Sequence, residues 1–229
     1  MTAPENNKKL SSTRRKHFSE GLNFYTLFWA FLIGSFVGVA AESLYCLIRF
    51  HQLNYTSGLL YGPFNIVYGL GALFITIGVY WLRKRNFVII LVAGMFIGAL
   101  VEFGCSWMQE KVFGSVSWDY AGQPYNIFGR TSLKLSLFWG ILAILWIKYF
   151  YPFMIRQIRR IPNNVAKPLT WALLLFMLFN LSMSAYGVWR WSDRLHGKPA
   201  QSAVDTYFDE YFPDMKMEKF YPNMKFVNK

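Results

Sequence analysis

The sequence predicts an all-α protein: a polytopic membrane helix bundle with about five transmembrane helices and a two-helix internal duplication. Hydrophobic residues make up 54% of the 229 positions, whereas charged residues make up only 16%. Apolar runs of 18 residues or more recur along the chain, and a soluble core does not require runs of that length. Helices satisfy their own backbone hydrogen bonds inside a bilayer, so we expect each run to be helical.

Five apolar segments define the expected domain organisation. The expected transmembrane helices run over residues 24–48, 58–82, 87–108, 130–151 and 168–191. Together they form one five-helix transmembrane domain over residues 24–191. A basic cytoplasmic arm at residues 1–23 precedes this domain. An extracytoplasmic tail at residues 192–229 follows it and could act as a lid.

The distribution of charge predicts an orientation. The net charge is +12, and lysine and arginine gather in the arm, in the 83–86 link and in the 152–167 connector. Loops rich in these residues stay on the cytoplasmic side of a membrane. We therefore expect the amino terminus inside and the carboxyl terminus outside. Because the basic residues flank apolar runs, they indicate membrane topology, and we expect no nucleic-acid partner.

An internal repeat pairs the first two expected helices with the next two. Residues 34–42 match residues 94–102 at two glycines, a phenylalanine and a glutamate, and the Pro-x-Asn-Ile motif at 63–66 matches that at 124–127. Two crossings restore the starting side, so we expect the units to be related by a pseudo-two-fold axis along the membrane normal. Glycines four residues apart share a helix face and permit close packing. We therefore expect the 24–48 and 87–108 helices to cross at these glycines. Their glutamates would then face each other or a shared cavity.

Polar residues from separate helices are expected at one level near the outer surface. A charge inside a transmembrane helix costs about 2.5–3.5 kcal/mol and usually has a function. The candidate substrate-binding residues are Glu42, Tyr61, Asn65, Glu102, Trp118, Asp119, Asn126, Arg130 and Lys134. Arg130 and Lys134 could neutralise the two glutamates. Two interpretations stay open: a substrate or proton site, and a structural ion-pair network. Trp118 and Asp119 either order their loop or contact a lid.

Metal and cofactor chemistry has no signature in the sequence. The three histidines do not show metal-ligand spacing, so we expect neither a metal nor a cofactor. The two cysteines, Cys46 and Cys105, could form a disulfide, but we favour two small buried packing residues.

Several of these residues together resemble the CmpB-like family of bacterial ABC-transporter permeases. The resemblance covers the chain from about Trp29 to its end. It rests on Glu42, Tyr61-Gly62-Pro63, Glu102, Trp118-Asp119-Tyr120, Asn126, Gly129-Arg130, Trp139-Gly140 and Pro222-Asn223. The resemblance implies a component of the bacterial cytoplasmic membrane that works with a separate ATPase subunit or as a homo-oligomer. The sequence contains no Gly-x-x-x-x-Gly-Lys-Ser/Thr phosphate loop, so this chain does not hydrolyse ATP by that route.

Three functions are compatible with these observations. We favour a transport component, a permease that binds a small polar or amphiphilic, lipid-like substrate at an outward-facing site inside the membrane. The first alternative is a membrane enzyme that acts on a lipid or lipid-linked substrate, with Glu42 or Glu102 as general acid or base. The second is a structural or sensory membrane protein. We expect no enzymatic activity, because no Ser-His-Asp, Cys-His or zinc pattern is present.

Overall fold

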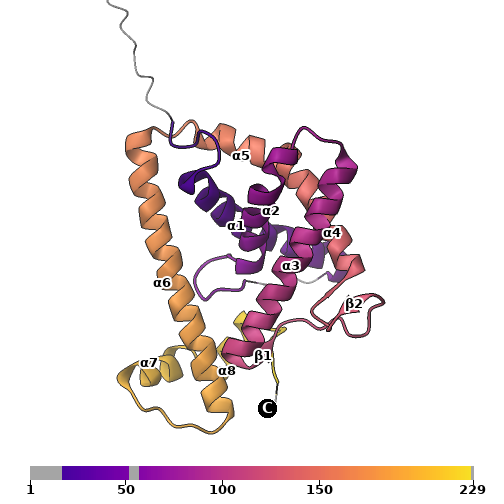
Figure 1. Ribbon diagram of the computed structural model, residues 1–229. Coiled ribbons are helices and arrows are strands. Elements are labelled where there is room, and N and C mark those ends of the chain that lie inside the picture. Colours follow the sequence, from indigo (N-terminus) through magenta and orange to yellow (C-terminus); the bar gives the residue numbers. More distant parts are fainter. Residues whose placement is uncertain (1–16, 52–56, 228–229) are drawn as a thin grey trace, which may run out of the picture.

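A computed structural model describes residues 17–51 and 57–227, and helices dominate it (Figure 1). The long elements are α1 (Phe24–Phe50), α2 (Ile66–Val79), α3 (Phe87–Phe113), α4 (Leu133–Leu145), α5 (Tyr151–Ile158) and α6 (Asn163–Leu195). A 3-10 turn (Tyr80–Leu82) extends α2, and a π-helical turn (Trp146–Phe150) joins α4 to α5. The shorter elements are α7 (Ala203–Tyr211), α8 (Asp214–Phe220), β1 (Ser115–Val116), β2 (Asn126–Ile127), β3 (Thr131–Ser132) and β4 (Lys225–Phe226).

Four helices are long and apolar enough to cross a membrane. They are Phe24–Arg49, Phe87–Phe113, Leu133–Ile158 and Asn163–Leu195. A fifth apolar helix, Ile66–Leu82, is shorter. The prediction of an all-α membrane helix bundle is confirmed.

Several predicted helix boundaries were wrong, and three of them change the description of the bundle. The second helix begins at Ile66 and not at residue 58, because Pro63 disfavours helix before it and the Asn65 side chain caps the helix by accepting from the Val67 N–H at 3.0 Å. The fourth helical span continues through the π-helical turn to the end of α5, so part of the predicted connector is helical. The last helix begins at Asn163, and Pro168 lies inside it.

In the first repeat unit, glycines bring α1 and α2 into contact. A Cβ atom added at Gly34 would collide with Ala72, and one added at Gly38 would collide with the ring of Tyr68. Close approach of the two backbones therefore requires glycine at both positions.

The second unit repeats this packing between α3 and α4. A Cβ atom at Gly94 would collide with Ala143, and one at Gly98 would collide with Trp139. The two hairpins thus share one packing register, which supports the predicted duplication.

The two repeat units are not arranged as the sequence predicted. The predicted crossing of α1 and α3 at the glycines was wrong, because each glycine pair packs inside its own hairpin. A two-fold axis between the units would map the contact of α2 with α3 onto a contact of α4 with α1. α2 does pack against α3, but α1 and α4 have no contact of similar extent in the described residues, so the predicted two-fold arrangement is not formed. Tyr68 and Trp139 are structural equivalents 71 positions apart, whereas Pro63 and Pro124 are 61 apart. The loop before α4 therefore contains the inserted residues.

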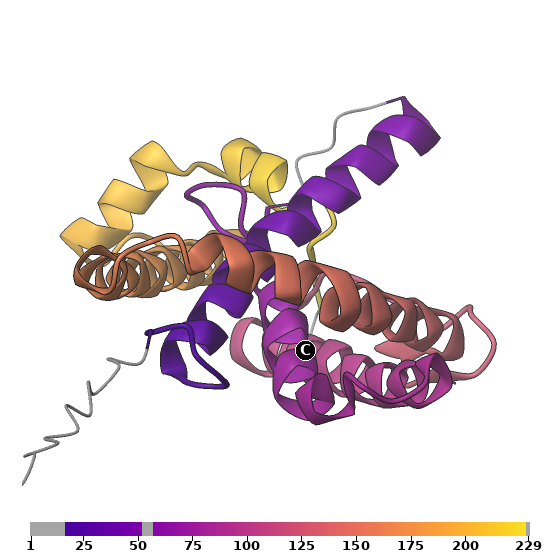
Figure 2. The same cartoon turned by 90° about the horizontal axis from the view of Figure 1, so that it is seen from above.

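The first helix leaves the bundle at its carboxyl-terminal half. Figure 2 shows α1 crossing the other helices obliquely, with its end projecting beyond them. Tyr45 and Ile48 in this half are 60% and 70% exposed. The amino-terminal half of α1 contacts α6. The Trp29 indole donates to the Thr170 hydroxyl at 3.0 Å, and the Phe24 ring stacks on the Trp171 ring with 5.4 Å between the ring centroids.

The described loops separate into two ends of the molecule. The 83–86 link and α5 lie at one end, and α7, α8 and β1 lie at the other (Figure 1). The basic loops therefore share one end, as the predicted topology requires. The side of the membrane that each end faces stays a prediction. Residues 1–16 of the predicted basic arm lie outside the described residues.

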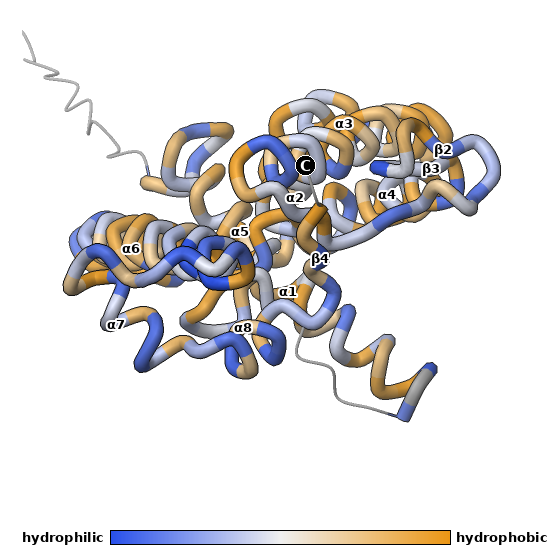
Figure 3. Tube along the Cα trace, turned by 90° about the horizontal axis from the view of Figure 1, so that it is seen from below, coloured by the Kyte–Doolittle hydropathy of each residue, from blue (hydrophilic) through white to orange (hydrophobic). Residues whose placement is uncertain are grey.

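The tail folds against the end of α6. Its core includes Trp191 of α6, Phe208 of α7 and Met217 of α8, all buried. β4 pairs with β1 in an antiparallel ladder. Figure 3, seen from this end, shows that hydrophilic residues are frequent in α7, α8 and the end of α6. The lid role of the tail stays a prediction.

Candidate intramembrane binding site

Glu102 is the more deeply buried of the two repeat glutamates. It lies on α3 with 6% exposure. Its carboxylate accepts hydrogen bonds from the Thr131 hydroxyl at 2.7 Å and from the Tyr120 hydroxyl at 3.2 Å. Both donors belong to the loop between α3 and α4, which folds back over the helix.

Side chains within this loop hold it in that position. Asn126 donates to the Gln123 carbonyl oxygen at 2.8 Å and accepts from the Gly129 N–H at 3.0 Å. Asp119 accepts from the Ala121 N–H at 2.9 Å, and the Trp118 indole donates to the Arg130 carbonyl oxygen at 2.9 Å. Gly129 has φ +69°, where a residue with a Cβ would be strained. The predicted binding residues Trp118, Asp119 and Asn126 therefore order the loop.

Glu42 has a parallel arrangement in the first unit. It is half-buried on α1, and its carboxylate accepts from the Tyr68 hydroxyl at 2.9 Å. Tyr68 lies on α2, where its ring packs against the bare backbone of Gly38. The glycine motif thus positions the phenol that binds the glutamate one helical turn further on.

The two glutamates and their tyrosines form one neighbourhood. Tyr120 interacts electrostatically with both Glu102 and Glu42, and Tyr68 interacts with both Glu42 and Glu102. Burial and the nearby carboxylates raise the pKa of the Tyr120 phenol well above its usual range. The phenol therefore stays protonated at neutral pH and remains a hydrogen-bond donor. We call Glu42, Tyr68, Glu102, Tyr120 and Thr131 the carboxylate-pair site.

The predicted cations do not join this site. Arg130 forms an ion pair with Glu110 and donates to the Ser106 hydroxyl at 3.2 Å. Lys134 is exposed, and it has no ion pair within the described ranges. The ion-pair network of two glutamates and two cations, one of the two open interpretations, is therefore not formed. The reason is that Arg130 lies in the loop, before α4 begins at Leu133, so it does not share a helix face with Lys134.

Tyr61 and Asn65 contact partners other than the glutamates in the described part of the chain. The Tyr61 backbone N–H donates to Asn180 at 3.1 Å, and its carbonyl oxygen accepts from the same side chain at 2.6 Å. Its ring stacks on Phe179 of α6 at 6.1 Å. Asn65 caps α2. These two residues fix the 57–65 segment to α6 and to the start of α2.

Sequence reasoning missed three members of the carboxylate-pair site. Tyr68 and Thr131 were not among the predicted binding residues, and Tyr120 was named only within the family motif Trp118-Asp119-Tyr120. A hydroxyl inside a predicted transmembrane helix, as at Tyr68, was the available signal. The loop contacts of Thr131 and Tyr120 required the tertiary structure.

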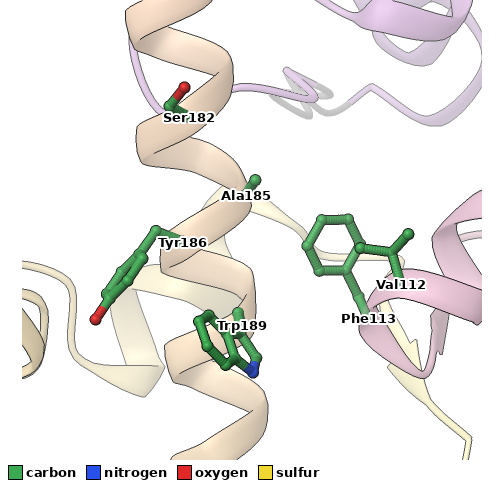
Figure 4. Close-up of a pocket in the computed structure, with 6 residues that line it drawn as sticks. All are labelled: Val112, Phe113, Ser182, Ala185, Tyr186 and Trp189. Carbon is green, nitrogen blue, oxygen red and sulfur yellow. The ribbon is translucent and has the colours of Figure 1, made fainter.

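Two apolar cavities lie beside α6. The first has a volume of about 340 Å³ and lies between α3 and α6 (Figure 4). It is lined by Val112, Phe113, Ser182, Ala185, Tyr186 and Trp189. The second, of about 300 Å³, is lined by Phe28, Phe31, Leu59, Ile66, Leu70, Leu174, Met177, Leu178 and Leu181. Both linings suit hydrocarbon, and neither includes a carboxylate-pair residue.

Residues suited to metal binding or to a disulfide are not brought together. Cys46 and Cys105 are both free thiols. Among the described residues, no group of three or more His, Cys, Asp or Glu side chains could hold a metal ion.

Comparison with known proteins identifies a family. No curated protein and no solved structure matches the chain. A family model described as "Putative ABC-transporter type IV" matches residues 29–185. This match runs from α1 to most of α6 and includes the whole carboxylate-pair site. Because it covers well over half of the sequence, the chain belongs to this ABC-transporter family of membrane proteins.

Proposed function

We propose that the chain is a transport component that binds a small polar or amphiphilic substrate at the carboxylate-pair site, facing the outer side of the membrane. The family supports a membrane component of a transporter. The observation that carries the proposal is that two glutamates from matching repeat positions interact electrostatically with the same two tyrosines, Tyr68 and Tyr120. Each glutamate is bound by a tyrosine hydroxyl, and neither has an ion pair in the part of the chain that the structure describes.

The chemistry of the site favours a substrate with a positive charge or several hydrogen-bond donors. An ionised carboxylate offers about four lone-pair sites, and the hydroxyls of Tyr68, Tyr120 and Thr131 occupy only some of them. A charge within a membrane helix is costly unless it is paired. Arg130 does not provide this pairing, because its charge is matched by Glu110. A cationic substrate group would supply the missing charge.

The rest of the molecule fits this role. The chain would act in the bacterial cytoplasmic membrane with its amino terminus inside. It would work with a separate ATPase subunit or as a homo-oligomer. The folded tail would lie outside and act as a lid. The apolar cavities beside α6 have linings that would accept the hydrocarbon part of an amphiphilic substrate.

Ligand-dependent stability tests this proposal. The purified protein would be unfolded by heat in detergent, in separate samples that each contain one ligand. The ligands are choline, other small quaternary ammonium ions, glycine betaine and succinate. A ligand at 100 times its Kd stabilises the folded state by about 2.7 kcal/mol. We expect at least one cation to raise the melting temperature of the wild type, and succinate to have no effect.

Two site variants and one control make the test specific. Glu102→Gln and Glu42→Gln should reduce or abolish the cation effect. Glu218→Gln removes an exposed carboxylate from α8 and should keep it. The proposal would be wrong if no cation stabilised the wild type, or if the effect survived both site substitutions.

A further inference from the structure

The end of the molecule opposite the tail carries an exposed basic surface. The 83–86 link, α5 and the start of α6 lie far apart in the sequence but meet at this end (Figure 1). Their exposed cations are Arg83, Lys84, Arg85, Arg156, Arg159, Arg160 and Lys167. Within the described segments that form this end, 17–23, 80–87 and 146–171, the sequence has one carboxylate, Glu20. The surface is therefore strongly positive, and we call these seven residues the basic end.

One face of α5 is apolar and the other is charged. Tyr151, Met154 and Ile158 are buried against the bundle, whereas Arg156 and Arg159 are exposed. Figure 1 shows α5 lying across the end of the bundle. A helix with these two faces, lying across the ends of membrane helices, is typical of the membrane–water interface.

Hydrogen bonds hold the link beside this helix. The Lys148 ammonium donates to the carbonyl oxygens of Arg83 at 2.7 Å and Arg85 at 3.2 Å. The Arg83 guanidinium lies 3.9 Å from the centroid of the Tyr80 ring. The Phe18 N–H donates to Asn163 at 3.0 Å. The surface is thus formed by fixed elements before any partner binds.

Exposed aromatic side chains accompany the cations. Trp81 is 74% exposed, Tyr149 60%, Phe153 56% and Trp171 51%. Aromatic side chains of this kind concentrate where a membrane protein meets lipid headgroups. Cations and aromatics at one level suit a headgroup layer whose phosphates are negatively charged.

From these observations we propose that the basic end binds the headgroups of anionic phospholipids, with Arg156 of α5 and Arg159 and Arg160 just after it as the principal contacts. This concerns a surface distinct from the carboxylate-pair site and does not depend on the substrate. Basic clusters beside membrane helices bind anionic lipids by this electrostatic mechanism. The hydroxyl-lined glutamates play no part in it.

Lipid retention measured by native mass spectrometry tests the proposal. The full chain would be reconstituted in nanodiscs of equal parts phosphatidylcholine and phosphatidylglycerol, then released and weighed with its bound lipids. The triple variant Arg156→Gln, Arg159→Gln, Arg160→Gln should retain at least about fivefold less phosphatidylglycerol. This is the effect of losing about 1 kcal/mol, the contribution of a single basic residue near the surface. Phosphatidylcholine retention should not change.

Matched variants separate charge from folding. Lys111→Gln, Lys219→Gln, Lys225→Gln removes three exposed cations from the opposite end and should retain lipid like the wild type. Arg156→Lys, Arg159→Lys, Arg160→Lys keeps the charge and should also retain it. Equal loss of phosphatidylglycerol in the glutamine variants of both ends would overturn the proposal. Wild-type retention of phosphatidylglycerol in the variant Arg156→Gln, Arg159→Gln, Arg160→Gln would also overturn it. If that variant then lost binding to a co-expressed ATPase subunit, the basic end would be a surface for a protein partner.

Discussion

Gly98→Ala in α3 should destabilise the protein, whereas Gly104→Ala in the same helix should not. A Cβ atom at Gly98 would overlap the Trp139 side chain on α4, but one at Gly104 would have no neighbour within 4 Å. Overpacking of this kind costs about 1–3 kcal/mol. Replacing glycine by alanine in a helix interior gains up to about 1 kcal/mol. We therefore expect a net loss of up to about 2 kcal/mol at Gly98 and a gain of up to about 1 kcal/mol at Gly104. Because both sites share the propensity gain, the two variants should differ by the overpacking cost of about 1–3 kcal/mol.

Thermal unfolding of the two purified variants in detergent would measure this difference. In a protein of this size, 1 kcal/mol changes the melting temperature by about 2–4 °C. The two variants should therefore differ by roughly 2–12 °C. Equal melting temperatures would refute the packing of α3 on α4 at Trp139, and with it the common register of the two hairpins.

Three further changes test the loop, the tail and the response to acid. Tyr120→Phe removes a hydrogen-bond donor to Glu102 and should cost about 1.5–3 kcal/mol of stability. Tyr125→Phe, at an 81% exposed position of the same loop, should be neutral. Equal melting temperatures of the two variants would contradict this. Arg190→Gln breaks the ion pair with Asp209 that fastens α7 to α6. Because Asp209 is partly exposed and still pairs with Arg194, this should cost about 1.5–3 kcal/mol, and it should expose the tail to limited proteolysis; wild-type resistance would argue against this attachment. A tyrosine hydroxyl of α6 and backbone N–H groups lower the pKa of Asp205 to about 2, below its usual value of about 3.9. Its stabilisation of α7 is thus complete above pH 4 and is lost as the pH falls towards 2; amide exchange of α7 should accelerate in that window, and Asp205→Asn should reduce the pH dependence and leave the part that comes from Asp209.

The sequence predicted helices well where a physical requirement was local. The long apolar runs predicted five spans, and four of them are helices long and apolar enough to cross a membrane within the described residues, because a bilayer imposes their length. The second helix was placed eight residues too early, because residues 58–62 are largely apolar although Pro63 follows them. The length of an apolar run does not reveal where a proline and a capping Asn65 begin the helix.

The glycine motifs predicted where close packing occurs but not which helices meet. Gly38 and Gly98 do contact large side chains, Tyr68 and Trp139, as a glycine face permits. The partner in each case is the other helix of the hairpin. A sequence pattern gives the face of a helix, whereas the neighbour depends on the length and course of the connecting loops.

For the candidate site, the sequence indicated the glutamates but misassigned their partners. Opposite charge favoured Arg130, yet its position in the loop brings it to Glu110. The donors to Glu102 are the uncharged hydroxyls of Tyr120 and Thr131, which a charge-based search overlooks. Their approach depends on a loop fold that no short motif predicts.

The central claim is that the two repeat glutamates form a substrate site. An experimental structure of the protein, purified with native lipid and saturated with the most stabilising cation of the panel, tests it most directly. We expect ligand density between Glu42 and Glu102, in contact with the hydroxyls of Tyr68 or Tyr120. Density confined to another part of the molecule, or none, with both carboxylates still bound only to their tyrosines, would contradict the claim.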